Sequence, residues 1–398
     1  MQRLGALEGI KVLDLTRVLA GPFCSMIMAD MGANVIKIEE AGKGADERSM
    51  GPFKNGESAY YMNLNRNKKG ITLNLKSPKG KQIFKDLVKK ADVVLENYRP
   101  GTMAKLGLGY DVLKEINPGI IYGCISGFGQ YGPYTKRPGY DIISQAMSGL
   151  MSTTGWPGGD PTRSGTAMGD VLGGLSCTIG VLAAIYNRSH TGLGQMVDVA
   201  LVDSAVASLE IINMIYLVEG RLPQRIGNRY ESTYPYDSFH AKDDLFIIGA
   251  GNDKLFRLFS NHIGRPELAD DPRFAKTGNR AVNWAELRPI VEEWTKTKTA
   301  AEAVEELLAI GVPAAPIYNI AQVVADPHIG GAREMFVDIV HPKAGPIKIT
   351  GSHIKLSGTP SSIRTPSPNL GQHNEEVLSS LLGMKKEEIA ALKEEGVL

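Results

Sequence analysis

Residues 10–38 read IKVLDLTRVLAGPFCSMIMADMGANVIKI, and their order of apolar segments is the clearest indication of a fold class in the chain. Ile10–Leu15 is a short apolar run rich in strand-forming residues, Gly21-Pro22 then opens a helical stretch, and Asn34–Ile38 has the composition of a second strand. A strand, a helix and a strand within about thirty residues form a βαβ unit, in which the two strands are parallel. The opening of the chain therefore predicts a parallel sheet.

The alternation of strands and helices continues beyond this unit. Ser77-Pro78 is an N-cap followed by proline at the first helical position, and it opens a helix that extends to Lys90. Further strands are expected at residues 71–75, 93–95, 120–126 and 195–200. Longer helical segments are expected at residues 140–151, 170–187 and 201–217. This pattern is typical of an α/β fold with a parallel sheet and helices on both of its faces.

The composition changes after Gly220. A pair of strands at 237–241 and 245–249 and charged helices over residues 252–310 predict a smaller α+β domain. Since 398 residues exceed what one hydrophobic core usually organises, two domains are the natural expectation. Further strands are expected at 336–340 and 347–349, before a polar helical tail that begins at residue 375. The predicted organisation is a large domain of residues 1–220, a small domain of 221–327 and a segment of 328–398 that returns to the large domain.

Bulk properties exclude several classes of protein. The net charge of +1 gives no global electrostatic argument for binding nucleic acid or a membrane. Cys24, Cys124 and Cys177 form no C-x-x-C pair, which favours a reducing compartment without structural zinc. The histidines show no H-x-x-x-H spacing, so no metal site is expected. The first residues lack the apolar run of a signal peptide, and the apolar stretch 173–186 is too short to cross a bilayer. We therefore expect a cytoplasmic protein.

The first strand–helix junction, Thr16–Pro22, is a candidate ligand-binding loop. In a doubly wound sheet, ligands bind beyond the carboxyl ends of the strands, where helix N-termini offer unpaired amides. The loop has one glycine before its proline instead of G-x-G-x-x-G, which argues against a nicotinamide enzyme. The alternative is a simple tight turn with Pro22 at the first helical position.

A group of cations is expected around two other junctions, and a polyphosphate ligand would need several such charges. Its members are Lys68, Lys69, Lys76, Lys79, Lys81, Arg99 and Lys105. The alternative is a solvated helix face, which suits Lys79 and Lys81 better than Lys76.

The segment SGTAMGDVLGG at residues 164–174 places one carboxylate, Asp170, among small residues just before an apolar helix. Asp170 could simply cap that helix. As a nucleophile, it would be ionised at neutral pH without a partner base, and the glycines would let a ligand approach. Because burial raises the pKa of a carboxyl, this second role requires nearby donors that keep Asp170 charged. Neither a G-x-S-x-G elbow nor a Walker sequence occurs in the chain.

A series of short motifs, in chain order, resembles the class III CoA-transferases, the CaiB/BaiF-type family. Each motif is weak alone, but the ordered series covers nearly the whole chain and is specific. The motifs are LEGIKVLDLT (7–16), AGP (20–22), GANVIKIE (32–39), NRNKK (65–69), ENYRPG (96–101), GYD (139–141), GD (169–170), TGLGQ (191–195) and LGQH (370–373).

The resemblance implies a Rossmann-like large domain built from both chain ends, a small domain in the middle third, and a homodimer of interlocked subunits. It implies that the substrates are an acyl-CoA and a small carboxylic acid, and that Asp170 carries first an acyl anhydride and then a CoA thioester. Arg17 and Tyr140 would lie beside the reacting centre. The CoA contacts that the motifs imply are Val18, Ala20, Leu73, Lys76, Asn97, Tyr98 and Lys105.

Three departures separate the chain from the formyl-CoA branch of this family. Arg17 and Leu19 stand where that branch has histidine and glutamine, and Glu40 stands where it has a basic residue. A glycine-rich loop before the strand at Leu245 is also missing. Transfer from formyl-CoA to oxalate is therefore disfavoured, and one anionic CoA contact is lost or supplied from elsewhere.

An α-methylacyl-CoA racemase, or another CoA-ester isomerase or lyase of this fold, is the main alternative. The racemase branch has Gly-His-Asp where this chain has Gly139-Tyr140-Asp141. A tyrosine, with a pKa near 10, is a poor base at neutral pH. The sequence therefore favours CoA transfer over proton exchange, and both over a non-catalytic protein that binds CoA or a nucleotide.

Overall fold

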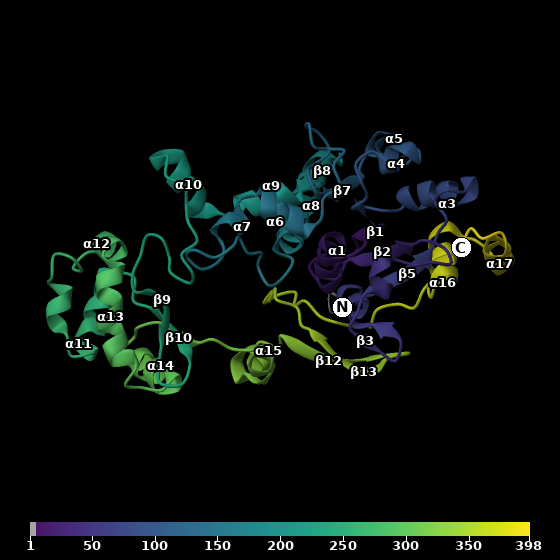
Figure 1. Ribbon diagram of the computed structural model, residues 1–398. Helices are drawn as coiled ribbons and strands as arrows, with labels where there is room; N and C mark the ends of the chain where they lie inside the picture. The colour runs from purple at the N-terminus through teal and green to yellow at the C-terminus, as the bar shows by residue number, and fades with distance from the viewer. Residues whose placement is uncertain (1–4) are drawn as a thin grey trace. The chain divides into compact units, whose positions relative to one another are not determined.

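The computed structural model describes residues 5–398 and contains two compact units (Figure 1). The larger unit is formed by the described residues up to Leu150, by Arg163–Met214 and by Pro327–Leu398. The smaller unit is formed by Met151–Thr162 and Ile215–Asp326. The larger unit thus combines both ends of the described chain, and the smaller unit includes a short segment that lies before the predicted boundary at residue 220.

A six-stranded parallel sheet organises the larger unit. Its strands are β1 (Lys11–Asp14), β2 (Asn34–Glu39), β5 (Lys68–Thr72), β6 (Val93–Glu96), β7 (Ile121–Ser126) and β8 (Met196–Ala200). Their spatial order is β5-β2-β1-β6-β7-β8, so the direction of strand addition reverses between β1 and β6. This is the order of a doubly wound, Rossmann-like sheet, and it confirms the predicted α/β fold with a parallel sheet.

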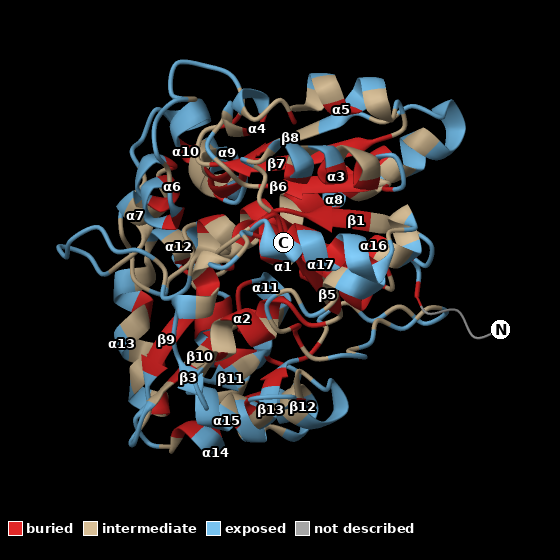
Figure 2. Ribbon diagram, turned by 90° about the vertical axis from the view of Figure 1, so that its right-hand side faces the viewer, coloured by how far each residue is buried: buried red, intermediate tan, exposed pale blue. Residues whose placement is uncertain are grey.

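Helices cover both faces of this sheet. Successive side chains of a strand point to opposite faces, and neighbouring residues of β1 belong to two different core clusters. Val12 belongs to a core cluster with α1 (Ala20–Asp30) and α8 (Met168–Thr191). Leu13 belongs to a second cluster with α3 (Pro78–Val88) and the C-terminal helices α16 (Asn374–Leu382) and α17 (Lys386–Glu394). Buried residues accordingly follow the central strands in Figure 2.

The remaining elements of the larger unit are short. They are α2 (Ala59–Leu64), α4 (Thr102–Lys105), α5 (Tyr110–Ile116), α6 (Asp141–Met147), α9 (Leu201–Ala207), the 3-10 helix η1 (Asp46–Ser49), the π-helix η3 (Pro327–Ala332), and the hairpins β3–β4 (Phe53–Lys54, Glu57–Ser58) and β12–β13 (Phe336–His341, Gly345–Thr350). Helices α7 (Leu150–Thr153) and α10 (Glu210–Glu219) each contain residues of both units.

The edge strand β5 begins earlier than the sequence predicts, at Lys68 instead of residue 71. The side chain of Lys68 is fully buried, and its Nζ lies 3.0 Å from Asp14 Oδ2. A lysine that the sequence places among surface cations therefore enters the sheet. The start of α16 covers this edge, where Asn374 Oδ1 accepts a hydrogen bond from the Thr72 N–H at 2.8 Å. The C-terminal segment thus lies beside β5 and shields a strand edge from pairing with another chain.

The helix that the sequence predicts at 201–217 is broken. Helices α9 and α10 meet at an angle of 76°, with Ser208 and Leu209 between them. Glu210, the first residue of α10, has a φ of 37°, which no continuous α-helix contains. An apolar run alone does not reveal such a break.

The smaller unit contains a three-stranded antiparallel sheet in the order β11-β10-β9. The strands are β9 (Tyr236–His240), β10 (Leu245–Gly249) and β11 (Ala314–Pro316). The helices are α11 (Asp253–His262), η2 (Pro266–Ala269), α12 (Thr277–Val282), α13 (Trp284–Thr295), α14 (Ala300–Ala309) and α15 (Ile320–Ala325). One core cluster, which includes Phe246, Phe259 and Leu287, joins sheet and helices.

Helix α8 has 24 residues, so the apolar segment is longer than the predicted stretch of 173–186. By length and composition alone, α8 could cross a membrane, and so could the bent pair α9–α10 if taken as one span. The argument that this segment is too short is therefore wrong. In the described chain α8 packs on α1 and β7 and contributes Cys177 and Val181 to a core cluster, and core helices meet the same criterion.

Candidate active site

The candidate active site is a cavity of about 200 Å³ at the carboxyl ends of β1, β6 and β7. It is lined by residues 17–20 after β1, 97–100 after β6, 125–127 at the end of β7, 137–140, Asp46, Asp170 and Leu201. Open α/β sheets bind ligands where the strand order reverses, which here is between β1 and β6. We call this space the active-site cavity.

The structure brings together most of the residues singled out from the sequence. Those that line the active-site cavity are Asp170, Arg17, Val18, Ala20, Asn97, Tyr98 and Tyr140. Three others do not line it. Leu73 is buried in the core, Lys105 is an exposed residue at the end of α4, and the exposed Lys76 forms an ion pair with Glu40 at 3.1 Å.

Asp170 lies in the first turn of α8 but does not cap the helix. The N-cap position is Ala167, which has no side chain capable of capping. Instead, Asp141 of α6 accepts hydrogen bonds through Oδ1 from the N–H of Gly169 at 2.7 Å and of Asp170 at 3.4 Å. The capping role that the sequence allowed for Asp170 is therefore wrong, and its carboxylate is left to face the active-site cavity.

The electrostatic environment of Asp170 differs from the expected one. No hydrogen-bond donor among residues 5–398 contacts its carboxylate, although the sequence argument required donors that keep it charged. Burial, and secondarily the negative charge of Asp141, raise the pKa of Asp170 to about 7. The carboxyl is therefore about half ionised at neutral pH.

Asp141 is the cap of α8, a role that the sequence analysis did not assign to it. It is buried, its Oδ2 accepts a hydrogen bond from Gln145 Nε2 at 2.8 Å, and Arg163 lies 3.7 Å from the same oxygen. In the sequence it stands in the GYD motif at the start of a helix, next to Tyr140, and nothing there links it to residue 169. Its contact with Gly169 joins residues 28 positions apart and is visible only in the folded chain.

Gly169 is required by this cap, because a Cβ at this position would lie 2.1 Å from Ser144 Oγ and 3.1 Å from Asp141 Oδ1. We expect Gly169→Ala to lower the free energy of unfolding by about 1–3 kcal/mol through overpacking, as measured by urea denaturation. The double variant Gly169→Ala/Ser144→Ala removes the clashing hydroxyl and should recover most of the loss. An equal loss in both variants would contradict this account.

The loop before α1 is fixed from several sides. The side chain of Asn97 bonds both backbone groups of Arg17: Asn97 Oδ1 accepts from the Arg17 N–H at 2.9 Å, and Asn97 Nδ2 donates to the Arg17 carbonyl at 2.7 Å. The Arg17 guanidinium lies 3.0 Å from Asp46 Oδ2 and 5.4 Å from the ring centre of Tyr98. Helix α1 begins at Ala20, so Pro22 occupies the third position of the helix. The sequence suggests the first position, and that suggestion is wrong.

The predicted cation group separates in the structure, and of its seven members only Arg99 lines the active-site cavity. Lys69 pairs with Glu376 at 2.7 Å, and Lys79 pairs with Glu395 at 2.6 Å. The solvated-face interpretation therefore fits Lys79. Arg137, which the sequence reasoning missed, lines the cavity and stacks over the Tyr134 ring at 3.6 Å.

Tyr60 is another residue near the site that the sequence reasoning missed. Burial, followed by the charges of Asp170 and Glu47, raises the pKa of Tyr60 to about 12, so this tyrosine keeps its proton at neutral pH. Among residues 5–398, no group of three or more histidine, cysteine, aspartate or glutamate side chains is arranged to hold a metal ion.

Comparisons with known proteins identify the family. The sequence model of CoA-transferase family III matches residues 7–374. The chain is 39% identical to human succinyl-CoA:glutarate CoA-transferase, covering 100% of this chain and 91% of that protein. It is 38% identical to succinyl-CoA–D-citramalate CoA-transferase of Chloroflexus aurantiacus, covering 98% of both chains.

A solved structure agrees with these sequence matches. The crystal structure of a CaiB/BaiF family protein from Brucella suis superposes with a TM-score of 0.82 and 39% identity, covering 95% of this chain and 99% of that one. The active-site cavity lies in the part of the chain that the family model matches. The chain therefore belongs to CoA-transferase family III and is a CoA-transferase, an enzyme that uses acyl-CoA as a substrate.

Proposed function

We propose that this enzyme moves CoA from an acyl-CoA donor to a carboxylic acid through two covalent intermediates on Asp170. The observation that carries the proposal is the carboxylate of Asp170, which lines the active-site cavity at the switch point of the sheet and has no hydrogen-bond donor among residues 5–398. A carboxylate with no competing partner is free to attack a bound thioester.

The reaction balances without a proton. A carboxylate oxygen of Asp170 attacks the thioester carbonyl carbon, and the carbon–sulfur bond breaks, which gives a mixed anhydride and CoA thiolate. The thiolate then attacks the Asp170 acyl carbon, and the donor acid leaves as a carboxylate with the bonding electron pair. The acceptor carboxylate reverses both steps. No histidine is among the described residues that line the active-site cavity, and this sequence of steps needs no general base.

The residues that the family resemblance implies are proposed in matching roles. Val18, Ala20, Asn97 and Tyr98 would bind CoA from the cavity wall, and Arg17 and Tyr140 would flank the reacting carbonyl. Lys76 and Lys105 would contact the outer part of CoA, and Leu73, whose side chain is buried in the core, would do so only through its backbone. The ion pair of Lys76 with Glu40 is mostly exposed, so a phosphate of CoA can replace Glu40 at little cost.

We further propose that the acids exchanged are dicarboxylic. The relatives named above act on succinyl-CoA, glutarate and citramalate, which all carry a second carboxylate. Three arginines, Arg17, Arg99 and Arg137, line the active-site cavity against two carboxylates, Asp170 and Asp46, of which Asp46 is paired with Arg17. An excess of positive charge of this kind supports binding of an anionic acyl group as well as of CoA.

The assembly and location also remain proposals. Large apolar side chains on α8, such as Ile179 and Tyr186, are about 70% exposed, which supports a protein partner surface and fits the interlocked homodimer implied by the family. The two compact units would serve as the large and small domains. Three buried free cysteines support a reducing, cytoplasmic compartment.

The test is a transfer assay with succinyl-CoA and a panel of dicarboxylic and monocarboxylic acids in heavy water. We expect a new acyl-CoA only when an acceptor is present, higher kcat/KM for dicarboxylic acids, and no deuterium at the α-carbon of the recovered thioester. Deuterium uptake without an acceptor would establish the racemase alternative instead, and equal rates for both classes of acid would remove the dicarboxylate proposal alone.

A further inference from the structure

The loop between β1 and α1 contains a residue in an unfavourable conformation. Val18 has a φ of 67°, in the left-handed region that β-branched residues rarely adopt. Such a backbone persists only where the surrounding structure imposes it. Because residues 17–20 line the active-site cavity, whatever imposes this conformation also shapes the wall that faces Asp170.

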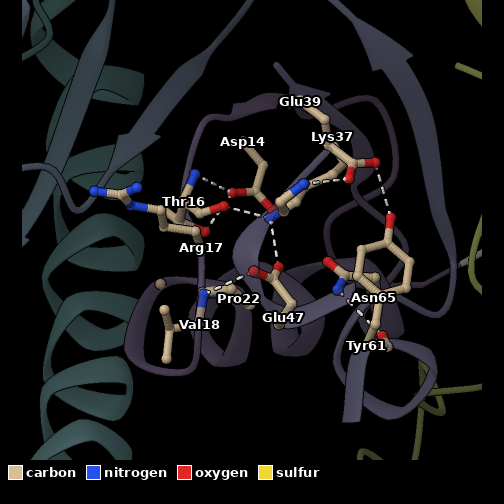
Figure 3. Close-up of polar contacts among 12 residues, drawn as sticks. Asp14, Thr16, Arg17, Val18, Pro22, Lys37, Glu39, Glu47, Tyr61 and Asn65 are labelled. Atoms are coloured by element: carbon tan, nitrogen blue, oxygen red, sulfur yellow. Dashed lines mark hydrogen bonds and ion pairs between the residues drawn. The ribbon is translucent and has the colours of Figure 1, made fainter. Parts of the chain in front are cut away.

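Glu47 of η1 and Lys37 of β2 impose it (Figure 3). The Val18 N–H donates to Glu47 Oε2 at 2.9 Å, and Glu47 Oε1 lies 3.2 Å from Lys37 Nζ. Lys37 Nζ also donates to the carbonyl oxygen of Thr16. With the two bonds from Asn97 to Arg17, all four polar atoms of the peptide groups on either side of Arg17 are bound by side chains.

The Glu47–Lys37 pair is not explained by stability. Both side chains are fully buried. Burying two opposite charges carries a desolvation penalty that their attraction often fails to recover, so an apolar pair of similar volume commonly stabilises a fold equally well or better. An apolar pair would not fix the geometry of the loop, because apolar side chains offer neither an acceptor for the Val18 N–H nor a donor for the Thr16 carbonyl.

We propose that Glu47, held by Lys37, is a positioning residue for CoA transfer. It fixes the peptide groups around Arg17 and thereby the approach of the cavity wall to Asp170. In the described part of the chain, the N–H groups of Leu19 and Ala20 donate to no acceptor. Both residues line the active-site cavity, so a fixed loop leaves these two donors available to an oxygen that becomes negatively charged in the transition state. The inference rests on the proposed function.

The decisive variant is Lys37→Met/Glu47→Met, which removes both charges and keeps the volume. We expect it to fold with a lower urea midpoint than the wild type, because the Val18 N–H and the Thr16 carbonyl lose their partners. We expect kcat to fall about 100-fold, the scale of a displacement of about 1 Å at a reacting centre. The KM for acyl-CoA should change by much less than kcat, although Val18 and Ala20 are proposed CoA contacts, and the Val18 amide should exchange hydrogen faster than in the wild type. The matched control is Asp30→Leu/Arg66→Met. It replaces a buried ion pair, in which Arg66 Nη2 lies 2.7 Å from Asp30 Oδ2, that does not contact the loop, so kcat should be unchanged.

A purely structural role would give the opposite pattern, with normal kcat in the folded Lys37→Met/Glu47→Met variant. That result would overturn the inference. If the double variant fails to fold, Glu47→Gln decides the question, because a folded Glu47→Gln enzyme that keeps wild-type kcat after the Val18 amide has lost its protection from exchange overturns it equally. Asp170→Ala, measured in the same assay, separates the two claims: only a fully active Asp170→Ala enzyme would overturn the proposed function.

Discussion

Replacing Asp170 with alanine is expected to lower kcat for CoA transfer by at least about 1,000-fold, because the proposed reaction has no second nucleophile to carry the acyl group. The other carboxylate of the active-site cavity, Asp46, is paired with Arg17 at 3.0 Å and is not free to replace it. The measurement is the rate of formation of the new acyl-CoA at saturating donor and acceptor. Asp170→Asn should be equally impaired, since an amide retains the shape but not the nucleophilic oxygen.

The matched control is Asp203→Ala, which removes an exposed acid from the first turn of the neighbouring helix α9 and should leave kcat within about threefold of wild type. Trapping gives an independent readout. Wild-type enzyme mixed with acyl-CoA and then hydroxylamine should yield a hydroxamate at Asp170, detected by mass spectrometry of the peptide. An active preparation in which Asp170 stays unmodified would contradict covalent catalysis.

The arrangement of the sheet could be predicted because its signals are local. The stretch from β1 to β2 alternates apolar strands with a helix, and burial of the strands on both faces requires long apolar runs there. The start of β5 could not be predicted, because the groups that bind the buried Lys68 include Asp14 and Ser25, which lie 54 and 43 positions away in the sequence. The break between α9 and α10 is equally invisible in a run of apolar residues.

The candidate site was predictable where it depends on strand ends and not where it depends on contacts between distant segments. The loops at residues 17–20 and 97–100 follow strands, so the carboxyl edge of the sheet brings them together. Asp170 stands out by its small neighbours. Asp141 and Glu47 act on backbone N–H groups 28 and 29 positions away, and no local pattern marks a side chain as the cap or the anchor of a remote loop.

The second large effect concerns pH. Only the ionised form of Asp170 is a nucleophile, and burial together with Asp141 raises its pKa to about 7 in the free enzyme. The value of kcat/KM for the acyl-CoA donor reports this free-enzyme pKa. We therefore expect kcat/KM to be constant above about pH 8 and to fall tenfold per pH unit below 7. At pH 5 it should be about 100-fold below its plateau, since about 1% of Asp170 is then ionised.

Asp141→Asn isolates the charge contribution, because an amide oxygen at this position still accepts the bond from the Gly169 N–H while the negative charge is gone. Its removal should lower the pKa of Asp170 and move the acid limb of the profile to lower pH, so that the variant retains more of its plateau activity at pH 5 than the wild type does. Asp203→Ala should leave the limb in place. If the acid limb of the wild-type kcat/KM profile lay near pH 4, the range of an ordinary aspartate, it would contradict the raised pKa of Asp170. If the limb were unchanged in Asp141→Asn, the raised pKa would be assigned to burial alone.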